Sequence, residues 1–279
     1  MNTRIMTIFT RTPLHVGCGS SVGAVDQPVA RERHTRFPII PGSAIKGVLA
    51  DLWVDWSDKD NPKRSGEGKK ILGDDSKDSA KAGSLLVGEG KLLAFPVRSA
   101  KNCFAWITCP FVLRRFAADT KRNLAIPEVE ESKVFAPSSL MFDGTAIFEE
   151  YPLASCGGVS ENVADAFSEL VSDPIWNNEV KNRLAIVSDE MFAYFAENAC
   201  EIANHNRIDD ASGVVAKGAL FSQENIPSET MFYAVFNSRT EDDFEKLQAK
   251  LEEEKNLLQS GADMTTGLGW CTVAMKEVK

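Results

Sequence analysis

The chain has 279 residues, of which 43% are hydrophobic and 25% charged, a composition typical of a globular protein rather than a disordered one. The formal net charge of −9 argues against a free-standing nucleic-acid-binding protein, whose surface is normally basic. No apolar run reaches the roughly eighteen residues of a membrane span, and the first ten residues lack the apolar core of a signal peptide. We therefore expect a cytoplasmic location and no membrane partner.

The first third of the chain predicts a strand followed by a helix. Residues 4–10 have the pattern of a buried strand, and residues 37–40 form a short apolar run. Pro41 and Gly42 end this run, and Ser43 is predicted to be the N-cap of a helix. That helix has an apolar face formed by Ile45, Val48, Leu49 and Leu52.

The rest of the chain predicts strands and helices in loose alternation. Residues 55–83 are rich in Asp, Lys, Ser and Gly, which indicates an exposed or partly disordered insertion. Strands are expected at 92–97, 104–108, 231–236 and 270–275. Helices are expected from Pro110 onward and at 162–172, 188–203 and 241–258, with a hairpin at 207–221. This order favours a single α+β domain over residues 1–279, with a ferredoxin-like core that carries insertions.

A glycine-rich loop holds one isolated carboxylate, that of Asp26. The loop glycines, Gly17, Gly19 and Gly23, have the spacing GxGxxxG, and no helix follows them, so the dinucleotide-binding fingerprint is not met. Glycine does let a backbone approach a phosphate closely. A turn in which Asp26 caps its own loop explains the carboxylate equally well.

Basic residues follow this loop and favour phosphate binding. They are Arg31, Arg33, Arg36 and Lys46, opposed by the single acid Glu32. Free N–H groups at the start of the helix after Gly42 are suited to an anion, with Ser43 and Lys46 in the first turns. A plain N-cap and a solvated basic surface are the alternative. A second loop with hydroxyls and glycines contains Thr266, Gly267 and Gly269, and it too can be only a turn.

Metal and cysteine chemistry finds little support in the residue spacing. The six cysteines include no Cys-x-x-Cys pair and the three histidines are dispersed, which excludes the usual structural zinc spacings. We interpret the cysteines as buried or incidental thiols.

Several motifs together resemble a known family. They are LHVGCGSSVGAVDQPVARERH with FPIIPGSAIKG, then LLAFPVRS with FAWITCPFVLRRF, then NRIDDASGVVAKGALFSQENIPSETMFY, and finally TTGLGW. This set resembles RAMP-superfamily CRISPR proteins, and specifically the backbone subunits of type III-B Cmr effector complexes. The resemblance covers nearly the whole chain and is poorest in residues 55–83.

The resemblance implies a ferredoxin-like or RRM-like palm with a hairpin thumb. Copies of such a subunit line up in a helical backbone along a CRISPR guide RNA, beside other subunits of the effector, and cut the bound target RNA at regular intervals. The catalytic aspartate of the family corresponds to Asp26, while His15 and Glu229 match positions suspected of supporting cleavage. Guide RNA contacts are implied for Ser43, Lys46, Thr266, Gly267 and Gly269, and with less support for Arg98. From the basic cluster we add Arg31 and Arg33.

One carboxylate is enough for this chemistry. RNA carries its own nucleophile, the 2′-hydroxyl, so a protein need only hold the linkage in line and stabilise the developing charge. A hydrated divalent cation, Mg²⁺ or Mn²⁺, held by Asp26 and by phosphate oxygens is able to do this. His15 then serves as a proton carrier or as a phosphate donor.

Two other functions remain open at this stage. A pure scaffold would bind guide RNA without cutting the target. A small-molecule enzyme that uses the glycine-rich loop would be active as an isolated subunit.

Overall fold

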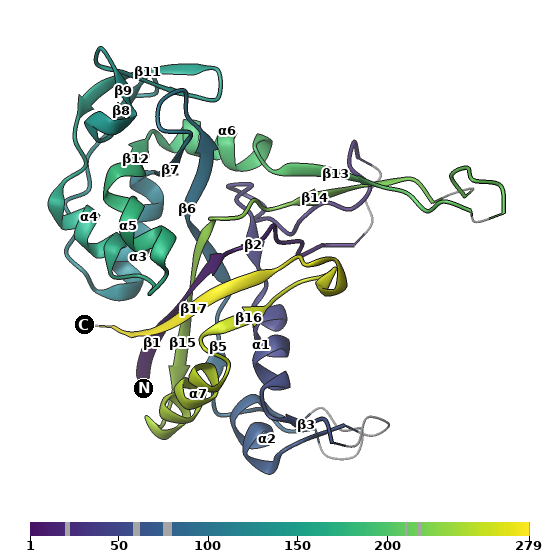
Figure 1. Cartoon of the computed structure of the whole chain (residues 1–279). Coiled ribbons are helices and arrows are strands. Elements are labelled where there is room, and N and C mark those ends of the chain that lie inside the picture. The colour runs from purple at the N-terminus through teal and green to yellow at the C-terminus, as the bar shows by residue number, and fades with distance from the viewer. Residues whose placement is uncertain (20–22, 58–61, 75–79, 210, 217–218, 279) are drawn as a thin grey trace.

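The fold is a mixture of helices and strands in which most strands join one large mixed sheet (Figure 1). This computed structural model describes residues 1–19, 23–57, 62–74, 80–209, 211–216 and 219–278. The predicted α+β class is confirmed. Within these ranges no helix is both long and apolar enough to cross a bilayer.

One half of the sheet is antiparallel and combines both ends of the chain. Across the sheet its strands are β16 (Leu257–Gln259), β17 (Trp270–Glu277), β1 (Asn2–Thr10), β15 (Met231–Ser238) and β6 (Gly90–Arg98), with β2 (Ile39–Ile40) beside β6 and β5 (Leu86–Val87) beside β15. Helix α1 (Gly42–Asp51) lies between β1 and β6 along the chain, and α7 (Asp242–Glu253) lies between β15 and β17. All the strands predicted for this half are present.

The other half of the sheet was mostly missed by the sequence patterns. It continues from β6 through β7 (Phe104–Thr108), β12 (Leu184–Val187), β8 (Lys133–Phe135), β11 (Tyr151–Gly157), β10 (Thr145–Phe148) and β9 (Met141–Phe142). Its helices are α3 (Pro110–Thr120), α4 (Glu161–Ser168), α5 (Pro174–Arg183) and α6 (Asp189–Asn198). Of these elements, the sequence predicted β7, α3 and the approximate positions of α4 and α6. Strand β12 was missed because it is buried along its whole length and therefore shows no polar alternation.

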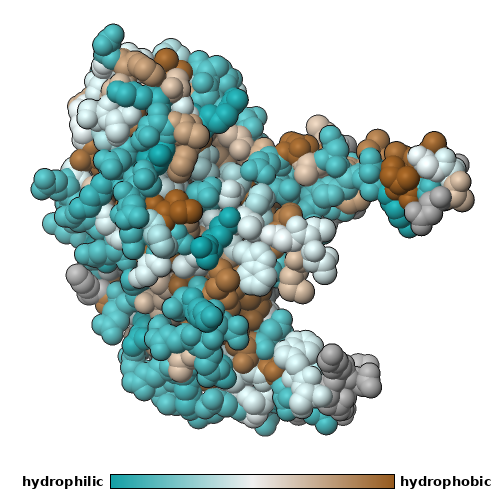
Figure 2. Space-filling model, viewed as in Figure 1, coloured by the Kyte–Doolittle hydropathy of each residue, from teal (hydrophilic) through white to brown (hydrophobic). Residues whose placement is uncertain are grey.

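A two-stranded hairpin projects far from the body of the molecule (Figure 1). It consists of β13 (Glu201–His205) and β14 (Phe221–Asn225), which pair in antiparallel register. The hairpin predicted at 207–221 is confirmed. Its first strand begins earlier and its second strand ends later than expected. Residues 210, 217 and 218 lie outside the described ranges. Apolar side chains are exposed along this arm (Figure 2), namely those of Ile202, Ile208, Val214, Val215 and Leu220.

The segment 55–83 is not wholly exposed. Strands β3 (Val54–Asp55) and β4 (Lys63–Arg64) pair with each other, and α2 (Gly66–Leu72) follows. Ser65 caps α2 by accepting the N–H of Gly68 at 3.1 Å, and Ile71 and Leu72 are buried. Residues 58–61 and 75–79 of this segment lie outside the described ranges.

Three predicted helix ends differ from those in the structure. Ser43 is not an N-cap, since α1 starts at Gly42 and the cap residue Pro41 has no side chain able to accept an N–H. Helix α6 ends at Asn198 because residues from 201 onward pair with β14. Helix α7 ends at Glu253, after which Lys255 and Asn256 take positive φ and turn the chain into β16.

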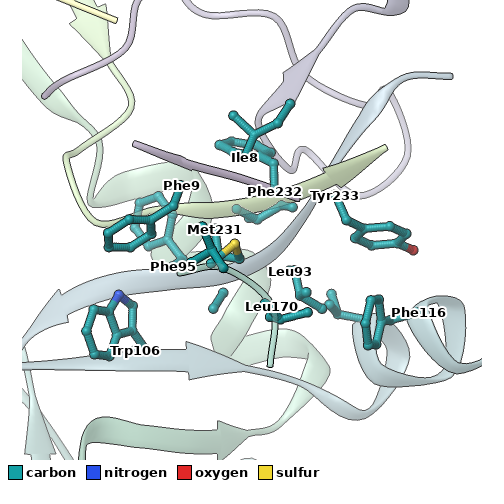
Figure 3. Packing of buried hydrophobic residues seen from close by; sticks show 14 of the residues in the cluster. Ile8, Phe9, Leu93, Phe95, Trp106, Phe116, Leu170, Met231, Phe232 and Tyr233 are labelled. Atoms are coloured by element: carbon teal, nitrogen blue, oxygen red, sulfur yellow. The ribbon is translucent and has the colours of Figure 1, made fainter. Parts of the chain in front are cut away.

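The core fills the space between the two halves of the sheet and its helices (Figure 3). Phe9 of β1 lies 6.3 Å from Trp106 of β7, and Phe116 of α3 lies 5.1 Å from Tyr233 of β15, measured between ring centroids. The indole Nε1 of Trp106 donates to the carbonyl oxygen of Glu229 at 2.6 Å. The core therefore fixes the turn from which β14 leaves the body.

Candidate functional site

Asp26 lies at the root of the projecting hairpin. Its side chain is exposed, and its carboxylate oxygen Oδ2 accepts the backbone N–H of Ser222 at 2.8 Å and the Ser222 hydroxyl at 2.9 Å. The N–H of Ser222, and secondly the hydroxyl, hold the pKa of Asp26 below its usual range. Oδ1 accepts no hydrogen bond from the residues that the structure describes. Among the described residues, the Asp26 carboxylate is hydrogen-bonded to Ser222, 196 positions along the chain, and not to its own loop. The residue remains exposed to solvent.

His15 also contacts strand β14, but it is buried. The residue is 6% exposed, and its Nδ1 donates to the carbonyl oxygen of Glu224 at 2.7 Å. A Cβ added to Gly17 would lie 2.7 Å from Nε2, so this glycine makes room for the ring. Because Ser222 and Glu224 are two residues apart in β14, their partners are anchored about 7 Å apart. The structure thus brings His15 and Asp26 to the same strand but presents only Asp26 to solvent.

Arg31 is part of the scaffold of the site rather than of its surface. Its guanidinium lies 2.5 Å from Oε1 of Glu224, with side-chain exposures of 5% and 10% for the two residues. It also donates to the carbonyl oxygen of Ala196 at 2.8 Å, and Oε2 of Glu224 accepts the N–H of Val29 at 3.0 Å. Arg31, predicted to contact RNA, therefore has its charge buried and paired. Arg33 remains exposed in the following turn.

The loop before β17 is joined to the same strand. Nε2 of Gln223 donates to Oδ2 of Asp263 at 2.7 Å, and the N–H of Ala262 donates to the carbonyl oxygen of His15 at 2.9 Å. The segments that carry His15, Asp26 and Asp263 are thus held together by β14.

Two predicted glycines in this loop have different roles. Gly267 is exposed at a φ of 89°, and a Cβ added there would meet nothing within 4 Å, so its backbone is open to a ligand. Gly269 is buried, and an added Cβ would lie 1.9 Å from the carbonyl oxygen of Ser260. Thr266 is exposed next to Gly267, although its hydroxyl donates to the carbonyl oxygen of Asp263 at 2.9 Å. Thr266 and Gly267 are accessible, whereas Gly269 serves packing.

Ser43 and Lys46 lie together on α1, where Ser43 is exposed and Lys46 half-buried. Neither makes an ion pair or side-chain hydrogen bond with the described residues. Both line a shallow cavity of about 260 Å³. The α1 face therefore offers a free cation next to a hydroxyl.

Arg98 and Glu229 lie together in a different place. They line one cavity of about 600 Å³, to which Asp26 does not contribute. Nε of Arg98 donates to Oε2 of Glu149 at 2.5 Å. Glu201 lines the same cavity, and its pKa is raised mainly by burial and secondly by the charge of Glu229. Glu229 follows the end of β14, whereas Asp26 is tied to its beginning. Within one chain these residues do not join the Asp26 site.

A metal ion held by the protein alone is not supported. Across the described ranges there is no group of three or more His, Cys, Asp or Glu residues placed to hold one. Asp26 offers one free carboxylate oxygen, which fits a cation that takes its other ligands from water and RNA phosphates. Sequence reasoning missed Ser222, Glu224 and Asp263. The polar run Ser222-Gln223-Glu224-Asn225, directly after the predicted hairpin, was a signal for the first two, and the sequence offered none for Asp263.

Comparisons with known proteins identify the family of the chain. A family model described as the RAMP superfamily matches residues 7–272. The protein named CRISPR system Cmr endoribonuclease Cmr4, from Pyrococcus furiosus, is 34% identical over 292 residues, covering 100% of this chain and 97% of that protein. The chain therefore belongs to the RAMP superfamily. The resemblance to backbone subunits of type III-B Cmr complexes, suggested by the sequence motifs, is confirmed.

Solved structures show the same fold. The crystal structure of oligomeric Cmr4 from Pyrococcus furiosus matches with a TM-score of 0.76 at 29% identity, covering 100% of this chain and 99% of that one. A chain in the cryo-EM structure of the type III-B Cmr-beta complex bound to cognate target RNA matches with a TM-score of 0.75 at 18% identity, covering 99% and 97% of the two chains. The second similarity concerns the fold alone.

The hydrogen bonds at Asp26 lead to a first prediction. Replacing Ser222 by alanine removes the hydroxyl donor and leaves the N–H, so the pKa of Asp26 should rise part of the way toward its ordinary value. An NMR titration of the carboxyl carbons measures this shift. Ser212→Ala is the matched control, since the Ser212 hydroxyl and N–H lower the pKa of Asp209 further out on the hairpin. An Asp26 pKa that moves equally in both variants would contradict the assignment.

The buried pair at Arg31 leads to a second prediction. Arg31→Ala leaves Glu224 buried without its cation, so the free energy of unfolding should fall by about 3–5 kcal/mol. Arg33→Ala, two residues away and exposed, should change it by less than ~0.5 kcal/mol. Urea denaturation of both variants measures the difference. Equal stabilities would mean that Arg31 does not hold the loop.

Proposed function

We propose that the chain is a guide-RNA-binding backbone subunit of a type III-B CRISPR effector and that it cleaves complementary target RNA, with Asp26 as its catalytic residue. The observation that carries this proposal is the exposed, ionised carboxylate of Asp26, fixed by Ser222 at the root of the projecting hairpin. The whole-length relative is named an endoribonuclease, and a similar chain was crystallised as an oligomer. The subunit would act in the cytoplasm, beside copies of itself and other subunits of the complex.

The proposed architecture is a ferredoxin-like palm with a hairpin thumb. Strands β17, β1, β15 and β6 are adjacent in that order, with α1 before β6 and α7 before β17, which is the arrangement expected of a βαββαβ unit. The β13–β14 hairpin with its exposed apolar side chains would be the thumb that enters the guide–target duplex. Copies placed side by side would then bring one Asp26 to the target at each repeat, so that cuts fall at regular intervals.

In the proposed cleavage the chain positions and stabilises, and the RNA supplies the nucleophile. Ser222 orients the Asp26 carboxylate, and its two hydrogen bonds hold the pKa of that group below its usual range. Asp26, with RNA phosphate oxygens, would hold a Mg²⁺ or Mn²⁺ ion, which when bound supplies positive charge next to the scissile phosphate. His15 holds the loop through the carbonyl of Glu224, so we give it a positioning role.

Guide RNA would bind along accessible residues of the loop after Asp26, of α1 and of the loop before β17. These are Arg33, Ser43, Lys46, Thr266 and Gly267. Arg98 and Glu229 keep only the support of the family resemblance, because they line a separate cavity. Arg31 and Gly269 would act indirectly, by holding the two loops in place.

The catalytic role of Asp26 is tested by a single substitution in the assembled complex. Asp26→Asn removes the charge and keeps the shape, so target cleavage should fall by at least about 10²-fold, while guide and target binding stay unchanged. The measurement is the rate at which a labelled target is cut, together with its affinity. Asp209→Asn is the matched control, because Asp209 is another hydrogen-bonded carboxylate of lowered pKa on the hairpin. Unchanged cleavage in Asp26→Asn would contradict the catalytic assignment of Asp26.

The divalent cation is tested separately. A chelator should stop cleavage by the assembled complex without releasing the target, and added Mg²⁺ or Mn²⁺ should restore it. The reason is that the described residues include no group of three or more ligands that would retain the ion without RNA. Cleavage that continues at full rate in excess chelator would remove the cation from the proposal and leave Asp26 in place.

A further inference from the structure

A cavity between α1 and the segment 64–81 has a strongly basic lining. It measures about 260 Å³, and its charged side chains are those of Lys46, Arg64, Asp74 and Lys81. Asp74 is paired with Lys69, whose Nζ lies 3.1 Å from Oδ2. Lys46 and Lys81 form no ion pair with any described residue. The cavity therefore holds an excess of positive charge in a protein whose net charge is −9.

Arg64 adds a fixed positive charge to this cavity. Its Nη1 donates to the carbonyl oxygen of Gly73 at 2.8 Å, which fixes the guanidinium between β4 and the end of α2. Its Nε is buried and has no hydrogen-bond partner among the described residues. The guanidinium would therefore attract an anion in the cavity through its charge.

The cavity also continues the surface proposed to hold RNA. Ser43 and Lys46 line it from α1, and Arg64 and Lys81 line it from the opposite side. The space-filling view shows the molecule hollowed between the projecting hairpin and the part that carries α2 and β3 (Figure 2). A strand that follows α1 in this hollow would reach the cavity.

We propose that this cavity is a phosphate-binding subsite for the guide strand, in which Arg64 and Lys81 bind the RNA backbone together with Lys46. The proposal rests on the proposed function, because the strand that reaches the cavity is the guide that runs along α1. Three cations with one paired acid leave the excess of positive charge that RNA phosphates require, and the planar guanidinium of Arg64 suits phosphate oxygens. Arg64 and Lys81, which lie in a segment where sequence patterns gave no reason to expect chemistry, would thus form one side of the guide-binding surface.

A neighbouring hollow favours a polymer over a small anion. It measures about 450 Å³, shares Arg64 and Asp74 with the first cavity and is lined by Trp56. Its other charged side chains are those of Lys63, Lys69 and Asp51, so its charge is more balanced. Trp56 is 57% exposed. An exposed aromatic ring beside phosphate-binding cations is the combination that holds single-stranded nucleic acids by stacking and charge.

The test measures binding of a labelled guide RNA by the full chain at several salt concentrations. The double variant Arg64→Ala/Lys81→Ala should bind the guide roughly tenfold more weakly, and the slope of log K against log salt should fall by about 1.4, since each phosphate contact contributes about 0.7. The matched control Arg239→Ala/Lys276→Ala removes two cations near the far ends of β15 and β17, and it should leave both quantities unchanged.

Loss of the Arg64 bond to Gly73 can loosen α2, so a second variant keeps the test decisive. Lys81→Glu changes an exposed side chain, and it should weaken guide binding at unaltered thermal unfolding. An unchanged affinity and salt slope in Lys81→Glu would overturn the proposal. A loss confined to binding of labelled target by a guide-loaded complex would also overturn it, because the cavity would then face the other strand.

These binding measurements distinguish a failure of the subsite from a failure of the proposed function, and neither requires cleavage. If Lys46→Ala weakens guide binding and Lys81→Glu does not, the subsite is wrong while the guide-binding subunit stands. If the unaltered chain and its assembled complex bind no guide RNA, both this inference and the proposed function are wrong.

Discussion

The site depends on the hydrogen bonds that fasten the loop of residues 14–31 to strand β14. Glu224 is at their centre, because its carboxylate binds both the Arg31 guanidinium and the Val29 N–H while its carbonyl binds His15. Glycine-rich loops are flexible and lose much conformational entropy when they are ordered. Buried, charge-assisted hydrogen bonds offset that loss here. Asp26 can then be fixed at Ser222 although its own surroundings are open to solvent.

Burial assigns different roles to residues of the same type. Arg31 and Arg33 are two positions apart, but the first is enclosed against α6 and Glu224 while the second stays in water. Gly267 and Gly269 divide in the same way, one open to solvent and one pressed against a carbonyl. A basic or glycine-rich motif therefore contains both the residues that touch a ligand and those that hold them in place. Side-chain type alone does not separate the two.

The distribution of charge reconciles an acidic protein with an RNA partner. Much of the negative charge lies on α7 and the turn after it, and Lys246 there is already paired with Asp242 and Glu67. Lys46, Arg64 and Lys81, which form no ion pair with the described residues, gather instead around the cavity beside α1. Screening limits the effect of charges more than about 10 Å apart, so the local excess of cations matters more to a bound strand than the net charge.

The sequence by itself determined the α+β class, the strands of the antiparallel half of the sheet, the hairpin and the family, because long amphipathic patterns and contiguous motifs encode these locally. It also singled out Asp26 and Lys46, which the structure leaves accessible. Only the tertiary structure decided that Ser222 holds Asp26, that Glu224 buries Arg31, and that Glu229 lies in another cavity. These contacts join residues up to about two hundred positions apart. Local periodicity carries no record of such pairs, since they form only when the loop folds back onto β14.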